Sequence, residues 1–350
     1  MGGEEGCGES VKSNAVTDQS NLAIIPPDFY ERQIRLEAIF MPHSRRQRDA
    51  MHGTERSPLR FVHYTSADAA LKIIATKRLW MRNAVCMSDF MEVQHGFGIL
   101  SKYFSDKTRH APLVAAIEEI APGATQSGIG LFDQWWHDTR FGTYIVSVSE
   151  HDATEDLHGR LSMWRAFGGN AARVAIVFNI PWLTGAGRAL SLLFSPVSYL
   201  REDDVHRNFE EVSENILANA DFLRSLGNDA IVQWIFSMLL VNVTCLKHEG
   251  FHEEREWRGI YSPKRLFSPL MEQSTEVISG VPQIVHKLPL DSAAAPELAD
   301  LDLSRIFDRL IIGPTQYPMA IREAFVGALT NLGVASPHER IFISGIPIRA

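Results

Sequence analysis

The sequence predicts an α+β domain in which a mixed or antiparallel sheet is interrupted by helical insertions. Hydrophobic residues make up 45% of the chain and charged residues 22%, a composition typical of globular proteins. Short apolar stretches with the spacing of strands alternate with helical stretches of unequal length, and no internal repeat is visible. This pattern favours a mixed α+β arrangement over a regular doubly wound parallel sheet.

The chain divides into a tail, a connecting region and one folded domain. Residues 1–22 are polar and acidic without apolar periodicity, which predicts a flexible tail. Residues 23–58 are expected to form a helix after two prolines and then a basic linker over 43–58. Its four arginines suit a solvated connector better than a phosphate-binding arm. Residues 59–350 are expected to form a single α+β domain with a helical insertion around 204–246.

The domain is expected to begin with a strand, a turn and a helix. Arg60–Tyr64 is a short strand candidate, and Ser66 can cap the helix that follows it. In residues 144–149 apolar side chains alternate with two serines, which is the period of a strand. Further strands are predicted in ARVAIVFNI, EREWRGIYS, PQIVHKLPL, RIFDRLIIGP and RIFISGIPI, and further helices in SDFMEVQHGFGILSKYF, APLVAAIEEIA and PMAIREAFVGALTNLG.

Charge and cysteine content narrow the class of protein. The net charge of -8 argues against broad, nonspecific binding of nucleic acid. The three cysteines are too few and too scattered for a disulfide framework, and the N-terminus lacks a signal peptide, so a cytoplasmic location is expected. The most apolar stretch, Trp234–Leu246, is too short to span a bilayer and predicts a buried helix, so no membrane association is expected.

An H-E-x-x-H motif occupies His248–His252. In zinc hydrolases both histidines of this motif face one metal from the same helix face. Here Gly250 disfavours a helix interior, and we expect it to end the apolar helix and place the histidines about a turn. A zinc-dependent hydrolase through His248 and His252, with a downstream ligand such as Glu276, stays open as an alternative. No metal ligand is assigned.

Several stretches together carry a resemblance to a known family. They are FVHYTS, IIATKRLWM, MSDFMEVQHG, VSVSE, MWRAFGGNAARVAIVF, KHEGFHEEREWR and RLIIGP. By their order and spacing the chain resembles the bacterial family of unknown function DUF2971 over most of residues 59–349. Where that family usually has Asn-Asp ahead of a glutamate, this chain has Ser88 and Asp89, with Glu92 in place.

That family in turn looks like a distant relative of ADP-ribosyltransferases, which bind NAD in a cleft between two small sheets. The resemblance therefore implies a split sheet and NAD as substrate. It also implies a first-strand histidine and hydroxyl side chains at the NAD site. By position these groups correspond to His63, Tyr64, Thr65, Ser147 and Ser149. His63 would hold the adenosine ribose or the nicotinamide amide by hydrogen bonds.

The resemblance also implies a late glutamate facing the ribose, which corresponds to Glu254 or Glu256. The pair is similar to the paired glutamates of arginine-modifying transferases, whose first-strand residue would be Arg60. Cleavage of the nicotinamide–ribose bond develops positive charge on the ribose, so a nearby carboxylate lowers the barrier. Glu256 is the first choice as the catalytic group. Without the resemblance, both glutamates would be read as surface groups or partners of Arg255 and Arg258.

The predicted function is that of an NAD-dependent ADP-ribosyltransferase or NAD glycohydrolase, in toxin or phage-defence biology. The acceptor of ADP-ribose, whether water, protein or nucleic acid, stays open. Besides the zinc hydrolase, the other alternative is a noncatalytic nucleotide-sensing or interaction module, in which Glu256 is structural.

Overall fold

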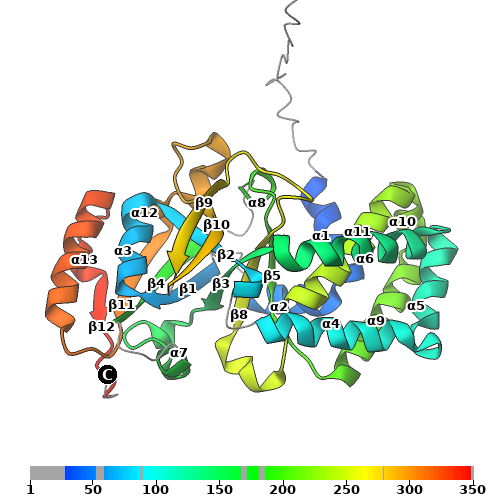
Figure 1. Ribbon diagram of the computed structural model, residues 1–350, viewed down its shortest axis with the longest axis horizontal. Coiled ribbons are helices and arrows are strands. Elements are labelled where there is room, and N and C mark those ends of the chain that lie inside the picture. The colour runs from blue at the N-terminus through cyan, green and yellow to red at the C-terminus, as the bar shows by residue number, and fades with distance from the viewer. Residues whose placement is uncertain are drawn as a thin grey trace, which may run out of the picture.

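The computed structural model describes residues 28–52, 59–86, 90–166, 172–180, 186–278 and 280–347. It confirms an α+β fold with a mixed sheet and many helices (Figure 1). The predicted tail, residues 1–22, lies outside the described residues, as do Ser88 and Asp89 and the side chain of Glu92.

Within the described residues, one large sheet contains ten strands in the order β12-β11-β4-β1-β3-β2-β10-β9, with β8 pairing to β3 and β5. Neighbours are antiparallel except β11 and β12, which are parallel. The strands are β1 (Leu59–Ser66), β2 (Arg78–Asn83), β3 (Tyr144–Glu150), β4 (Arg173–Ile180), β5 (Leu193–Pro196), β8 (Glu256–Tyr261), β9 (Glu272–Ile278), β10 (Val281–Pro289), β11 (Phe307–Ile312) and β12 (Ile341–Ile343). A separate parallel pair joins β6 (Ser198–Tyr199) to β7 (Leu246–Lys247).

Strand β3 has three partners, and this arrangement divides the sheet. Strand β8 follows one edge of β3 from Tyr144 to Ser149. The other edge is shared, because β1 meets β3 at its C-terminal end and β2 meets it at its N-terminal end. Between these contacts, the imidazole of His63 reaches the carbonyl of Ser147, with Nδ1 2.9 Å from the oxygen. The ladders of β1 and β2 therefore diverge from a common strand.

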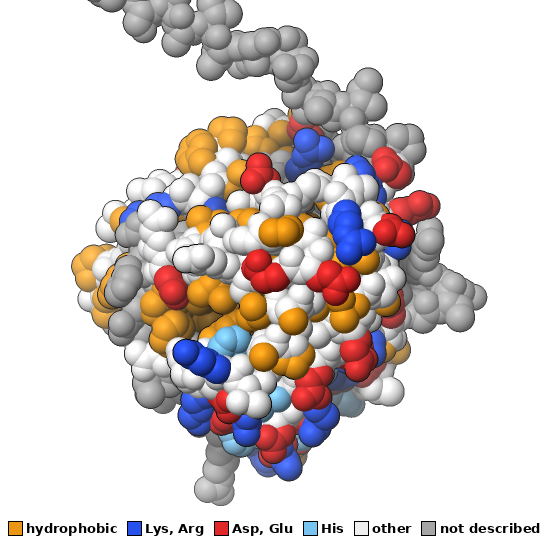
Figure 2. Space-filling view, turned by 90° about the vertical axis from the view of Figure 1, so that its right-hand side faces the viewer, with side chains coloured by type: hydrophobic (Ala, Val, Ile, Leu, Met, Phe, Trp, Pro, Cys, Tyr) orange, Lys and Arg blue, Asp and Glu red, His pale blue; other side chains and the backbone are white. Residues whose placement is uncertain are grey.

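Helices form a separate layer beside one end of the sheet, at the right of Figure 1. This layer contains α1 (Phe29–Phe40), α2 (Pro42–His52), α4 (Phe90–Ser105), α5 (Lys107–Ile120), α6 (Ala124–Gly142), α9 (Glu202–Ala218), α10 (Ala220–Leu226) and α11 (Asn228–Thr244). The remaining helices lie by the sheet and are α3 (Ala67–Thr76), α7 (Leu161–Ala166), α8 (Ala186–Ala189), α12 (Leu303–Ile306) and α13 (Pro318–Leu332). On the outer face of the helical layer, basic and acidic side chains are mixed around hydrophobic ones (Figure 2).

The basic stretch after α1 differs from the predicted linker, because it is helical as far as His52. Its arginines have acidic partners: Arg45 bonds Asp49 one turn away, and both Arg45 and Arg48 pair with Glu37 of α1. These pairs, and the packing of α2 against the sheet and α9, outweigh the poor apolar character of the stretch. Residues 53–58, the rest of the predicted linker, lie outside the described residues.

The apolar stretch Trp234–Leu246 forms most of α11, which is buried in the helical core as predicted. In the described part of the chain, no single helix is long and apolar enough to cross a membrane. Helices α10 and α11 would pass only as a pair, and the pair is bent by 108°.

Candidate functional site

A pocket of about 580 Å³ opens beside α2, where β1 and β8 begin and β3 ends. We call it the β3–β8 pocket. Its apolar wall comes from α2, β1 and β5, and its polar wall from the end of β3 and the turn before β8. The lining residues are Gln47, Ala50, Met51, Leu59, Arg60, Glu150, His151, Asp152, Ala153, Pro196, Val197, Tyr199, His252, Arg255 and Glu256. It combines an apolar surface with a few converging polar groups, which is typical of small-molecule sites.

Glu150, the last residue of β3, lines this pocket. Its Oε1 accepts a hydrogen bond of 2.9 Å from the indole Nε1 of Trp257, and its backbone N–H donates to the carbonyl of Arg255. Burial raises the pKa of the Glu150 carboxyl above its usual range, although Trp257 and Arg255 act in the opposite direction. Among the described residues no second donor is bonded to this carboxylate.

Glu256, the predicted catalytic group, begins β8 and is only 5% exposed. Arg258 binds both of its carboxylate oxygens, with Nε 2.8 Å from Oε1 and an Nη 3.1 Å from Oε2. Lys247 lies 3.4 Å from Glu256 Oε2 and 2.7 Å from Glu254 Oε2. Burial alone would raise the pKa of Glu256, but the attraction and hydrogen bonds of Arg258, aided by Lys247, lower it to about 2. Glu256 is therefore an ionised carboxylate whose charge two buried cations balance.

The two glutamates of the pocket face opposite sides of the sheet. Side chains alternate along a strand, so Glu256 and Arg258 share one face of β8 while Trp257 points to the other. Because Trp257 donates to Glu150, the Glu150 carboxyl lies on the face of Trp257. On that face, Trp257 packs with Leu59, Phe61 and Val148 in one apolar cluster, next to α2.

None of the predicted NAD-binding residues lines the β3–β8 pocket. His63 contacts Ser147 across the divergence of β1 and β3, and burial lowers the pKa of its imidazole. In the β3–β8 register, Ser147 lies opposite Arg258 and Ser149 opposite Glu256.

Tyr64 and Thr65 have other surroundings. The ring of Tyr64 packs edge-on against Trp164, with centroids 4.8 Å apart, and its hydroxyl accepts a hydrogen bond from the backbone of Arg160. Thr65 lies opposite Val174 of β4. Their role at an NAD site stays a prediction.

Arg160 forms hydrogen bonds to both parts of the polar wall, which are the end of β3 and the turn before β8. Its guanidinium donates to the carbonyls of Glu253 and Glu254 in the turn before β8, at 2.9 Å each. It also donates to the carbonyl of Glu150 at 2.7 Å and to both carboxylate oxygens of Glu155. All five N–H groups of the guanidinium are thus used.

Arg60, the alternative first-strand residue, does line the pocket. Its guanidinium is bonded to Asp156 and Asp308 at 2.7 and 2.6 Å. The neighbouring His151 has a fully buried side chain, and its Nε2 lies 3.0 Å from Asp156 Oδ1. Burial lowers the pKa of His151, so the imidazole is neutral at neutral pH.

The H-E-x-x-H segment is not an α-helix, as predicted, but Gly250 does not end the apolar helix, because α11 ends at Thr244 and β7 follows before His248. A 3-10 helix spans Glu249–Glu254, and the ring of His248 caps it by accepting a hydrogen bond from the N–H of Gly250 at 3.1 Å. His252 lines the β3–β8 pocket, whereas His248 lines a second pocket. Among the described residues, no group of three or more His, Cys, Asp or Glu side chains is arranged to hold a metal ion.

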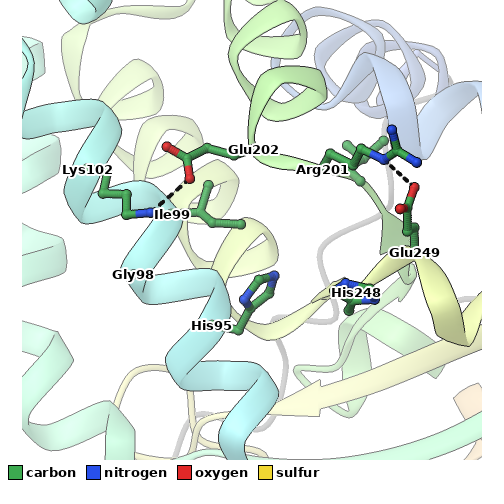
Figure 3. A pocket seen from close by; sticks show the side chains of 9 residues that line it. His95, Gly98, Ile99, Lys102, Arg201, Glu202, His248 and Glu249 are labelled. Atoms are coloured by element: carbon green, nitrogen blue, oxygen red, sulfur yellow. Dashed lines mark hydrogen bonds and ion pairs between the residues drawn. The ribbon is translucent and has the colours of Figure 1, made fainter.

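The second pocket, of about 330 Å³, lies between α4 and the start of α9 (Figure 3). We call it the α4–α9 pocket. His95 and His248 face each other across it, with ring centroids 6.4 Å apart. Its cations are paired with its acids: Lys102 bonds Glu202 and Arg201 bonds Glu249. Sequence reasoning gave no indication of this pocket.

Sequence reasoning also did not single out Glu150, His151 or Arg160. Only the serines of the stretch VSVSE were considered, although Glu150 ends the same strand. The alternation of that strand places Glu150 on the apolar face of Val148, where a carboxyl needs a specific partner. A charged residue at a position where the strand pattern predicts an apolar one could have identified Glu150.

Comparison with known proteins gives one match. No curated protein and no solved structure matches the chain, so the ADP-ribosyltransferase-like arrangement stays a prediction. The family model described as "Protein of unknown function (DUF2971)" matches residues 163–259, which run from α7 into β8 and include Glu254 and Glu256. Over residues 163–259, the chain is therefore similar to DUF2971, as its sequence predicts.

Proposed function

We propose that the chain binds NAD in the β3–β8 pocket and cleaves the nicotinamide–ribose bond, as an ADP-ribosyltransferase or NAD glycohydrolase. The observation that supports this function is the composition of the pocket. A carboxyl with a raised pKa and two arginines lie opposite an apolar wall, in a volume of about 580 Å³. Small-molecule pockets typically measure roughly 300–1,000 Å³.

The parts of NAD have complementary groups in this pocket. The apolar wall of Met51, Leu59 and Val197 suits an aromatic base. The guanidinium of Arg255 suits the pyrophosphate, which would compete for it with the exposed carboxylate of Asp152.

The carboxylates suit the chemistry of the bond. As nicotinamide leaves, positive charge develops on the ribose, and fixed negative groups stabilise it. The proposal of a toxin or phage-defence role rests on the family resemblance alone.

The test is to incubate the protein with NAD labelled in nicotinamide and to measure nicotinamide release and NAD binding. Ala153 lies exposed on the pocket wall, so Ala153→Trp should fill the pocket and abolish both signals. Ala294→Trp, at an exposed position outside the pocket, is the matched control and should retain them. A wild-type protein that neither binds NAD nor releases nicotinamide rejects the proposal.

A second candidate function is noncatalytic nucleotide sensing at the same pocket. It is favoured by the pairing of Glu256 with Arg258 and Lys247, which is the arrangement of a structural carboxylate. Binding of NAD that Ala153→Trp removes, without nicotinamide release by the wild type, would support this second function. The zinc-hydrolase alternative receives no comparable support, because His248 and His252 line different pockets.

A further inference from the structure

We propose that Glu150, rather than Glu256, is the catalytic base of the β3–β8 pocket, and that it takes the proton of an attacking hydroxyl group, in the simplest case water. This inference rests on the proposed cleavage of NAD and names the chemical class of the acceptor. It is carried by the position of Glu150 on the pocket wall and by the way its carboxyl is held.

The Glu150 carboxyl is anchored at one oxygen. Oε1 accepts the N–H of Trp257, whose indole is completely buried and packs against Phe61 and Phe194. The guanidinium of Arg48 lies 4.9 Å from the centre of the same ring. With Oε1 fixed by a rigid donor, Oε2 is the oxygen left to accept from a molecule in the pocket.

The strand that carries Glu150 is also held at this point. The backbone N–H of Glu150 donates to Arg255, and its carbonyl accepts from Arg160. The residue is therefore fixed at its backbone and at one side-chain oxygen. Such preorganisation is what a base needs in order to meet a bound nucleophile in one geometry.

Glu256 does not fit the role of a base. Both of its oxygens are bonded to Arg258, and its carboxylate lies on the face of β8 opposite Trp257. A carboxylate with a pKa near 2 is a weak proton acceptor. The pKa of Glu150 is instead raised above its usual range by burial, which brings its proton affinity nearer to that of a base working at neutral pH.

The step balances without any further reagent. The oxygen of water forms a bond to ribose C1′ as the bond from C1′ to the nicotinamide nitrogen breaks. The bonding electrons leave with nicotinamide and neutralise its ring. The proton of the attacking water passes to Glu150 and then to solvent. The products are ADP-ribose, nicotinamide and one proton, and no group is oxidised or reduced.

The experiment compares Glu150→Gln with wild type in nicotinamide release, NAD affinity and thermal unfolding. The glutamine retains an oxygen for Trp257 but cannot accept the proton. Turnover should fall by about 10²-fold or more, while NAD affinity changes little. In wild type, kcat/KM should rise with pH through the pKa of the base, and this acid limb should be absent from Glu150→Gln. Glu339→Gln, at an exposed position far along the chain, should behave as wild type.

Chemical rescue distinguishes a catalytic base from a residue that only maintains the structure. Azide attacks without losing a proton, so sodium azide should restore turnover of Glu150→Ala by about tenfold or more and yield ADP-ribosyl azide. If Glu150→Gln does not fold, nicotinamide release by a folded Glu150→Ala protein, measured with and without azide, gives the comparison with wild type.

Wild-type turnover in Glu150→Gln, or a lack of azide rescue in a folded Glu150→Ala protein, overturns the role of Glu150 and leaves the proposed function standing. A wild-type protein that releases no nicotinamide overturns both.

Discussion

Among single residues, Glu256 is an example of a side chain whose protonation and role depend on the cations that bind it. Its position at the start of β8 and on the face of Arg258 follows from strand alternation and could be predicted. Its ion pair with Lys247 could not be predicted, because Lys247 belongs to β7, which the fold brings beside β8. The sequence-level alternative that these acids pair with neighbouring arginines is correct for Glu256 and Arg258.

The variant Glu256→Gln should therefore destabilise the protein. It removes the carboxylate charge that is bonded to Arg258, which is 1% exposed, and breaking a buried ion pair in this way costs about 3–5 kcal/mol. Urea unfolding monitored by circular dichroism measures the change in the free energy of unfolding.

The double variant Glu256→Gln, Arg258→Met removes both charges and should recover much of this loss. A Glu256→Gln protein as stable as wild type would show that the pair contributes nothing to folding.

The burial of His286 predicts that the free energy of unfolding depends on pH. It is 2% exposed, neither ring nitrogen has a hydrogen-bond partner among the described residues, and Tyr144 and Tyr261 lie edge-on to its ring. Burial lowers the pKa of His286 in the folded state. Below about pH 6.5 the unfolded chain therefore binds a proton that the folded chain does not, and stability falls as the pH falls.

The variant His286→Phe should weaken the loss of stability between pH 7 and pH 5. His63 and His151 have pKa values lowered in the same direction, so part of the loss should remain. Urea unfolding at several pH values gives the slope, and His248→Phe, at an exposed position, is the control. Equal slopes for wild type and His286→Phe would contradict the assignment.

At the scale of elements, strands with an apolar face were predicted well and polar or charged elements were not. Strand β9 has mostly exposed or half-exposed side chains and was not predicted, because an edge strand lacks the alternation that marks a buried face. Helix α2 was predicted as a linker, because its stability comes from ion pairs with α1 and α9 rather than from its own pattern. Local sequence does not record such partners.

The segment between α11 and β8 was predicted as a turn from Gly250, and Arg160 holds that turn against β3. Replacing it in Arg160→Met leaves the carbonyls of Glu253 and Glu254 without this donor. Hydrogen exchange at backbone amides of residues 249–256 should become faster, and stability should fall by about 1.5–3 kcal/mol.

Arg165→Met is the matched control, because Arg165 is exposed on α7. Unchanged exchange in the Arg160 variant would show that the turn is stable by itself.

At the scale of the whole molecule, two hydrophobic cores meet at β3 and β8. Ile145 and Ile260 belong to the core of the helical layer, whereas Tyr144 and Tyr261, their neighbours in the same strands, belong to the core beside α3 and α13. The predicted helical insertion around 204–246 is occupied by α9, α10 and α11, and it packs together with α4 and α6 from an earlier part of the chain. Contacts of this range cannot be derived from periodicity.

The shared strands predict that the sheet and the helical layer unfold together. Phe236→Ala in the helical core and Phe325→Ala in the sheet core each remove a fully buried ring, at a cost of about 3–5 kcal/mol. Each variant should shift one common transition, seen equally by circular dichroism and by tryptophan fluorescence. Two separate transitions in either variant would show that the layers fold independently.

The turn between His248 and Glu256 is a wall common to both pockets. His248 and Glu249 border the α4–α9 pocket, and His252, Arg255 and Glu256 border the β3–β8 pocket. A molecule that displaces this wall from one side changes the shape offered to a molecule on the other side. The free energy of such a linkage would be the same in both directions.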